Sequence, residues 1–517
     1  MKTTILFLLG CLSLLADVSE RPALVIVLVI DGLRPDSITP ATMPQLDRLR
    51  SSGVWYTHSH SVFPTVTRVN TASIATGTLP LHHGIASNSV YLPLISKSVL
   101  SNGDYRNLLS LGQANGGRVV GPKSLHEYLQ AASIDYVALS SGSTGNALLL
   151  NPTAPYGNGR LINGGFENGS RVAFPDSLNA ALLGRFGAVK GGEDGDLALL
   201  WIERVLREYV LETINPKVIV NWMGRSDSAQ HGYGVGSPEA LAALRLIDGQ
   251  IGLLLQRLRQ INLEDKTDII VTCDHGFDYE PQADLLAPLR ESGFADDVAV
   301  DNEGGSTLLY VKNHDAEKIS KLVSKFQASA TTNAIFVPAK RPVGAAFECS
   351  PGAVKGFVAG TFALDLAYQC IPARGPDVII THRWDVEPNP FGVAGTQWVA
   401  GTAGQPAHNG HGGLNPFVTH STLLAVGPDF AQGKVVDVPA GNQDIAPTVL
   451  TLERLALPQT LDGRVLSEAF RKTSKSPVKT SSRRLQASAG DFCAEIEVSY
   501  AGSKRYLNQA RRCETSR

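Results

Sequence analysis

The stretch that decides the fold reads ALVIVLVIDG and occupies residues 23–32. Its first eight residues are all apolar, and such a run is typical of a central parallel strand covered on both faces. Further strand patterns occur at residues 217–223 and 268–273, and helical patterns stand between them. This alternation predicts an α/β fold with a doubly wound, mostly parallel sheet flanked by helices.

Other segments extend this pattern along the chain. The stretch 277–397 is less regular and rich in Gly and Pro, so we expect an inserted cap or subdomain there. Strands are expected at residues 136–139, 307–311, 377–381 and 422–426, and helices at residues 43–53, 70–77, 197–214, 238–258, 316–326 and 445–455.

The two ends of the chain differ from this core. Residues 1–19 join Lys2 to a short apolar run, which predicts a secretory signal peptide; a buried strand or an uncleaved anchor is the alternative. We therefore expect a secreted protein, or delivery to a vacuole or lysosome, with no membrane span after signal removal. The catalytic domain is expected at 20–470, followed at 471–517 by an exposed Ser/Lys/Arg-rich linker (472–484) and a disulfide-stapled extension.

Cysteine usage fits an oxidising compartment. Five cysteines remain when Cys11 of the leader is set aside, and one glycosylation sequon begins at Asn168. Closeness in sequence predicts two disulfides and one free buried thiol: Cys349 with Cys370, Cys493 with Cys513, and Cys273 alone.

Metal-ligand residue types follow three of the predicted strands. In open α/β sheets, ligands bind beyond the carboxyl ends of the strands, and Asp with His suits zinc. Any one of these residues alone would be an ordinary turn or surface residue; their joint occurrence indicates a metal site. The candidates are Asp31, then Asp227 and His231 on one helical turn, then Asp274 and His275, and one imidazole from His408 or His411.

The loop before the helix at 70–77 can supply a nucleophile. Two metal ions clamp the attacking and leaving oxygens of an in-line displacement, and a metal-bound threonine hydroxyl is a far stronger nucleophile. Thr67 leads into the helix, where backbone N–H groups favour a phosphate oxygen. Thr65, in the same loop, is the rival nucleophile.

Together these motifs resemble the alkaline phosphatase superfamily, and within it the nucleotide pyrophosphatase/phosphodiesterase family. The resemblance covers roughly residues 25–466, with the stretch 277–397 its poorest part. The motifs that carry it are VIDGLR (29–34), FPTVT (63–67), DSAQH (227–231), DHG (274–276), HGG (411–413) and DIAPT (444–448).

The resemblance implies an alkaline-phosphatase-like fold and two zinc ions. One ion would be held by Asp31, Thr67, Asp274 and His275, and the other by Asp227, His231 and His411.

It also implies the hydrolysis of phosphodiester or pyrophosphate bonds by Thr67, through a phospho-threonine intermediate. Asn88 would donate a hydrogen bond to a phosphoryl oxygen. The position of Thr67 before Asn70 favours it over Thr65, and the His-Gly-Gly form favours His411 over His408.

One position departs from the family pattern. Nucleotide-cleaving members resemble Thr-Phe-Pro-Asn at the nucleophile, whereas this chain has Thr67-Arg68-Val69-Asn70, which removes an aromatic face and adds a cation. Arg68 either turns to solvent or contacts a second anionic group on the substrate.

This departure leaves the substrate class open. A phosphonoacetate-type C–P hydrolase and a phosphomonoesterase are alternatives on the same site, and a catalytically idle binding glycoprotein is the alternative outside enzymes. The net charge of -2 provides no basic field for a nucleic-acid module. We expect a small phosphorylated or phosphonate substrate, and the oligomeric state is left open.

Overall fold

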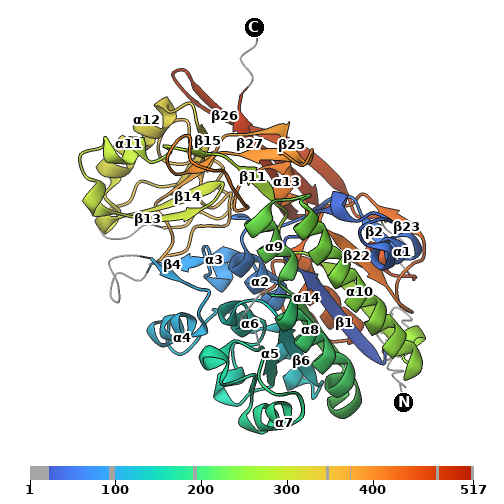
Figure 1. The fold of residues 1–517 in the computed structure, drawn as a ribbon. Helices are drawn as coiled ribbons and strands as arrows, with labels where there is room; N and C mark the ends of the chain where they lie inside the picture. The colour runs from blue at the N-terminus through green and yellow to red at the C-terminus, as the bar shows by residue number, and fades with distance from the viewer. Residues whose placement is uncertain are drawn as a thin grey trace, which may run out of the picture.

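The computed structural model describes residues 22–91, 99–189, 195–344, 348–372, 374–472 and 477–513. The predicted signal peptide lies outside these residues. Figure 1 shows a large sheet with helices on both sides and a smaller, separate group of strands at the upper left.

The large sheet confirms the predicted α/β class. β1 (Leu24–Ile30) lies at its centre, parallel to both neighbours and buried along its whole length. Five of the eight strand pairings are parallel, so the sheet is mostly parallel, as expected. Within the described residues the order is β23 (Lys434–Val436), β2 (Val54–Tyr56), β22 (Leu423–Val426), β10 (Thr267–Thr272), β1, β9 (Val218–Met223), β6 (Tyr136–Ser140), β7 (Arg160–Ile162) and β8 (Ala173–Phe174).

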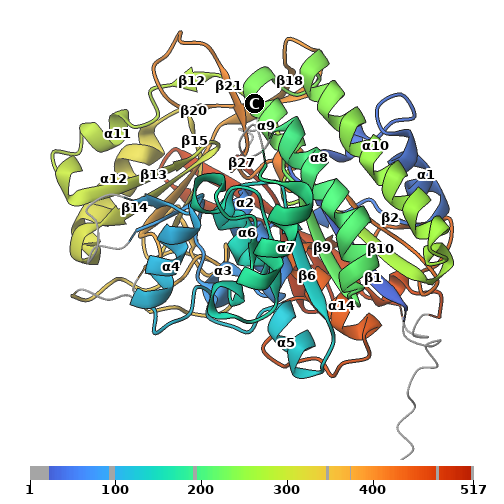
Figure 2. The same ribbon diagram turned by 60° about the horizontal axis from the view of Figure 1, so that its bottom comes forward.

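The side chains of β1 pack into two hydrophobic cores, one on each face of the sheet. Val25, Val27 and Val29 face one helical layer, and the alternate residues face the other. Figure 2 shows the two layers from a second direction. The first layer contains α2 (Thr67–Thr76), α5 (Leu125–Ala131), α6 (Thr144–Leu150) and α14 (Ile445–Leu452), and the second contains α1 (Pro44–Ser52), α7 (Asp176–Phe186), α8 (Asp196–Val205) and α10 (Pro238–Gln260).

Two predicted helices differ from the structure in detail. The helix expected at 70–77 begins three residues earlier, because Thr67 is already its first residue. The helix expected at 197–214 is α-helical only to Val205 and continues as a π-helix over Leu206–Ile214. No helix in the described part of the chain is both long and apolar enough to cross a membrane.

The stretch 277–397 is more regular than its composition indicates. It contains a second sheet with its own buried core, covered by α12 (Ala316–Ala328). The strand order is β13 (Val298–Glu303), β14 (Ser306–Val311), β17 (Val378–His382), β15 (Thr332–Val337) and β16 (Phe362–Ala363). Whether this unit acts as a cap stays a prediction.

The C-terminal region corrects one expectation. Residues 480–484, expected within an exposed linker, are the first half of β25 (Thr480–Ala489), which pairs with β26 (Phe492–Ala501). These residues look like a linker because their side chains are exposed, although their backbone is paired. β27 (Lys504–Arg512) completes this sheet, and side chains of all three strands join the core of the second sheet.

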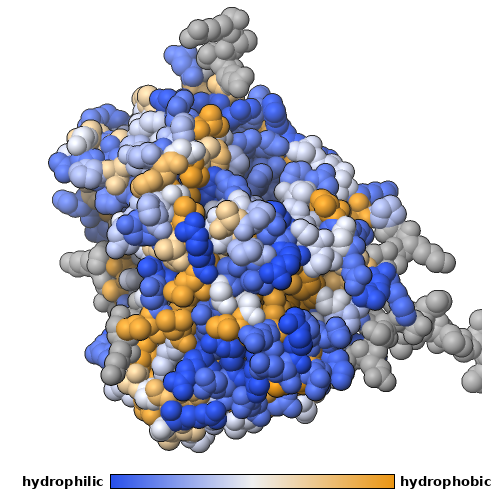
Figure 3. Space-filling model, turned by 45° about the vertical axis from the view of Figure 1, so that its right-hand side comes forward, coloured by the Kyte–Doolittle hydropathy of each residue, from blue (hydrophilic) through white to orange (hydrophobic). Residues whose placement is uncertain are grey.

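The predicted cysteine chemistry is confirmed. Disulfides join Cys349 to Cys370 and Cys493 to Cys513, and Cys273 is a free, buried thiol. Asn168 is exposed, and its glycosylation stays a prediction. The face seen in Figure 3 mixes hydrophilic residues with separate apolar patches, which is ordinary for a folded domain surface.

Candidate active site

The carboxyl ends of the central strands bring the predicted residues together. Asp31 directly follows β1, and Asp274 and His275 follow β10. α9 (Arg225–Tyr233), which follows β9, carries Asp227 and His231. Adjacent parallel strands end at one edge of a sheet, so residues more than two hundred positions apart meet there.

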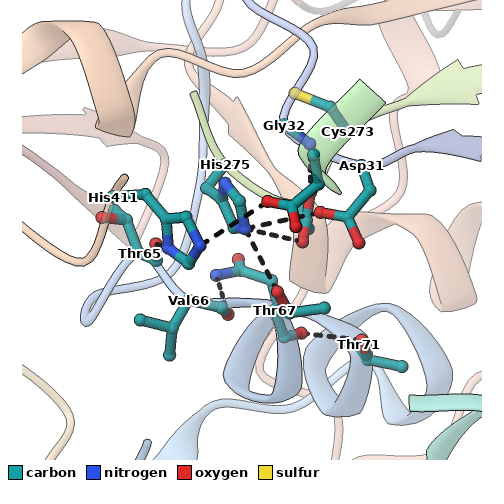
Figure 4. A network of polar contacts seen from close by, with 12 residues as sticks. Asp31, Gly32, Thr65, Val66, Thr67, Thr71, Cys273, His275 and His411 are labelled. Atoms are coloured by element: carbon teal, nitrogen blue, oxygen red, sulfur yellow. Dashed lines mark hydrogen bonds and ion pairs between the residues drawn. The ribbon is translucent and has the colours of Figure 1, made fainter. Parts of the chain in front are cut away.

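The first group surrounds the Nε2 atom of His275. This atom lies 3.2 Å from Thr67 Oγ1, 3.1 Å from Asp274 Oδ2 and 3.5 Å from Asp31 Oδ1. Figure 4 shows His275 between Asp31 and Thr67, with Thr67 at the start of its helix. All four side chains are at least nine-tenths buried.

The second group surrounds Asp227. Its Oδ1 lies 3.4 Å from His231 Nε2 and 3.7 Å from His411 Nε2. The His275 and His411 rings stack with their centroids 3.5 Å apart, so the two groups adjoin. His411 is buried, whereas His408 is exposed on β21 (His408–Gly410).

All three imidazoles are oriented in the same way. The Nδ1 of His231 contacts the Asn409 carbonyl at 2.7 Å, that of His275 the Gly276 carbonyl, and that of His411 the Thr65 carbonyl. A carbonyl oxygen only accepts, so each Nδ1 carries a proton and each Nε2 is turned toward a carboxylate. This is how backbone carbonyls orient histidines that bind metals.

The carboxylates show the complementary pattern. Asp31 Oδ1, Asp227 Oδ1 and Asp274 Oδ2 are buried without a hydrogen-bond donor, and these same atoms face the imidazole Nε2 atoms. Burial, followed by the charges of Asp274 and Asp227, raises the pKa of Asp31 well above its usual range. A cation between the two groups would offset the repulsion among these buried carboxylates. The set of carboxylate and imidazole donors therefore fits metal cations.

Hydrogen bonds distinguish the two threonines in the loop that leads into α2. The Thr65 hydroxyl donates to the Gly413 carbonyl at 2.8 Å and accepts from Gly412 N–H at 3.1 Å, so it ties this loop to the His411 loop. The Thr67 hydroxyl instead faces His275. Asn70 fixes the loop, because its Nδ2 donates to the carbonyls of Val62 and Val66.

Asn88 is held from two sides. Its Oδ1 accepts the Arg68 backbone N–H at 3.0 Å, and its own N–H donates to Glu303 Oε1 at 3.1 Å. These contacts leave the Nδ2 group of Asn88 unused. Ser87, beside it, hydrogen-bonds to Asp301.

The sequence did not single out several residues that shape the site. Trp222 Nε1 donates to Asp31 Oδ2 at 2.9 Å, and Asn442 Nδ2 donates to the Asp274 carbonyl at 3.0 Å. Glu303 reaches Asn88 from the second sheet. No motif marks these residues, because each contributes through a partner distant in the chain.

The chain is similar to several known proteins. Residues 25–385 match the family model for type I phosphodiesterase / nucleotide pyrophosphatase. Rat ectonucleotide pyrophosphatase/phosphodiesterase family member 3 is 25% identical over 263 residues, which is 49% of this chain and 25% of the relative. The human family member 1 is 26% identical over 256 residues, covering 48% and 23%. Human bis(5'-adenosyl)-triphosphatase ENPP4 is 23% identical over 259 residues, covering 50% and 48%.

The matched part is therefore half or less of each of these relatives. Among solved structures, murine ectonucleotide pyrophosphatase/phosphodiesterase 5, an inactive variant in complex with AMP, superposes with a TM-score of 0.58 at 16% identity. The match covers 84% of this chain and 96% of that chain. At this identity the similarity shows the shared alkaline-phosphatase-like fold.

Proposed function

The chain belongs to the type I phosphodiesterase / nucleotide pyrophosphatase family, and we propose that it is a two-zinc hydrolase of phosphodiester or pyrophosphate bonds. The observation that carries this proposal is the convergence of three buried carboxylate oxygens without a hydrogen-bond donor and three imidazole Nε2 atoms beside the Thr67 hydroxyl.

The residues divide into two ligand sets. Asp31, Thr67, Asp274 and His275 would hold one zinc ion, and Asp227, His231 and His411 the other. When bound, the ions supply the positive charge that activates a hydroxyl and stabilises phosphoryl oxygens.

Thr67 is the proposed nucleophile. Its hydroxyl oxygen attacks phosphorus, the leaving group departs on the opposite side, and a phospho-threonine forms that water then hydrolyses. The Nδ2 group of Asn88 donates to a phosphoryl oxygen as charge develops there. Thr65 is a weaker candidate, because its hydroxyl is already engaged with the His411 loop.

Arg68 supports a second candidate activity. A cation beside the nucleophile, where nucleotide-cleaving relatives have an aromatic residue, favours substrates with a second anionic group. A phosphonoacetate-type hydrolase or a phosphomonoesterase on the same site therefore remains the alternative.

The proposed setting is extracellular. The signal-peptide pattern of residues 1–19, the two disulfides and the exposed sequon at Asn168 support secretion or delivery to a vacuole or lysosome.

A substrate panel on the zinc-loaded protein tests the function. We expect turnover of an aryl phosphodiester or a dinucleotide, with an aryl phosphomonoester and phosphonoacetate as the competing substrates. Thr67→Ala should abolish turnover, while Thr67→Ser, which keeps a hydroxyl, should retain part of it. Turnover of none of the four would favour the idle binding glycoprotein, and full activity of Thr67→Ala would redirect the assignment to Thr65.

A further inference from the structure

The side chain of Arg68 is held by specific contacts next to Thr67, the proposed nucleophile. Its Nη2 donates to Ser143 Oγ at 2.7 Å, and a Cβ atom at Gly103 would lie 3.1 Å from the same nitrogen. Its Nε is buried without a hydrogen-bond partner. The guanidinium is therefore held in place, with part of its donor capacity unused among the described residues.

Hydrogen bonds and close backbone packing fix the residues around this guanidinium. Ser143 is the N-cap of α6 and also accepts from Asn146 N–H. Gly145 N–H donates to the Gly103 carbonyl at 2.8 Å, and a side chain at Gly145 would collide with the Asn102 carbonyl. α2 and α6 lie side by side in Figures 1 and 2, so Arg68 and Ser143 come from packed elements.

The charge of Arg68 is not neutralised by an ion pair with any described residue. Arg34, a buried arginine near the site, donates to both carboxylate oxygens of Asp36 and to the carbonyls of Phe277 and Ala394. Arg106, nearby on the surface, pairs with Asp104. Among these arginines, only Arg68 keeps its charge for a ligand.

Glu303, on β13 of the second sheet, is an acidic residue that interacts electrostatically with Arg68. Burial, and then the charge of Asp301, raises the pKa of Glu303 well above its usual range, which favours its neutral form. Its Oε1 is used by Asn88 N–H. Glu303 therefore does not cancel the attraction of Arg68 for an anion.

We propose that Arg68 and Ser143 form a subsite for a second anionic group, a carboxylate or a phosphate, on the part of the substrate that stays attached to phosphorus. Arg68 directly follows Thr67, so it lies on the attacking side. In-line displacement expels the leaving group from the opposite side. The group within reach of Arg68 is thus retained, and the guanidinium fork suits a two-oxygen contact.

This proposal rests on the proposed hydrolysis, and the test separates the two. The probes are p-nitrophenyl phosphodiesters whose retained alcohol is ethanol, glycolic acid, 2-phosphoethanol or 2-aminoethanol. For the wild type we expect kcat/KM for the carboxylate or the phosphate diester to exceed that for the ethyl diester by roughly 10- to 100-fold. The 2-aminoethyl diester should be the poorest of the four. The larger of the two anionic ratios identifies which anion the subsite takes.

Variants assign the preference to residues. Arg68→Leu should bring the ratio of anionic to ethyl diester close to one, and Arg68→Lys should keep part of it, because the charge remains without the fork. Ser143→Ala should raise KM for the anionic diesters more than for the ethyl diester. Arg106→Leu, which removes a neighbouring surface cation, should leave the ratio unchanged.

A binding measurement needs no variant. 2-Phosphoglycolate should inhibit the wild type at concentrations roughly 10-fold or more below those needed for ethyl phosphate. Equal turnover of the ethyl diester and both anionic diesters would overturn the subsite while leaving the hydrolase intact, and equal inhibition by these two monoesters would rule out a carboxylate as the bound group. Absence of turnover for every diester would instead count against the proposed hydrolysis.

Discussion

The buried carboxyl group of Glu203, on α8 in the second helical layer, leads to a quantitative prediction about the free energy of unfolding. Its side chain on α8 has no exposed surface, and Asn221 Nδ2 donates to its Oε1 at 2.6 Å. Arg207 lies 3.9 Å from the other carboxylate oxygen. Burial outweighs both partners and raises the pKa of Glu203 from its ordinary 4.5 to about 7.

The direction in which stability changes with pH follows from proton linkage. A raised carboxyl pKa means that the folded protein binds more protons than the unfolded chain between pH 4.5 and about pH 7. This contribution to stability is therefore fully present below pH 4.5, falls as the pH rises, and levels off above about pH 7. At about 1.4 kcal/mol for each pH unit, the total is about 3 kcal/mol.

Glu203→Gln should remove this dependence, because the amide has the same shape and no charge. Near pH 4.5 the variant should match the wild type, and at about pH 8 it should be more stable by about 3 kcal/mol. Urea unfolding measured across this range provides the comparison. Glu208→Gln, a half-exposed position on the following turn, is the matched control. Parallel stability curves for Glu203→Gln and the wild type would refute the reasoning.

Three further predictions concern the metal site. His411→Ala should lower the zinc content of the purified protein below about two ions per chain, as measured by elemental analysis, whereas His408→Ala should leave it unchanged. Equal zinc content in the two variants would contradict the choice of His411 over His408 as a ligand. Trp222→Phe removes the donor to Asp31 and should weaken zinc affinity roughly 10- to 100-fold in a competition titration; unchanged affinity would mean that this hydrogen bond does not orient the ligand. Prolonged chelation should abolish hydrolysis and lower the urea midpoint, since metal binding favours the folded state; an unchanged midpoint with zinc fully removed would show that metal does not stabilise the fold.

The sequence predicted the parts of this protein that depend on local pattern. An apolar run such as β1 can only be buried on both faces, and residue types at strand ends indicate where ligands gather. Asp31, Asp274 and His275 could therefore be expected together before their distances were known.

Local pattern failed where a feature depends on neighbouring segments. Residues 480–484 have linker composition, yet pairing with β26 makes them a strand. The direction of β22, antiparallel to both neighbours, likewise follows from how the chain returns to the sheet. Neither is encoded in the residues themselves.

The sequence by itself thus determined the α/β class, the Asp and His residues at the strand ends, and the pairing of Thr67 with the adjacent cation of Arg68. Only the tertiary structure decided that Thr65 holds the His411 loop, that Glu303 reaches Asn88 from a second sheet, and that Arg68 meets Ser143. The physical reason is that periodicity reports which face of an element is buried. Hydrogen bonds between elements far apart in the chain arise only when those faces pack, and no local pattern specifies that packing.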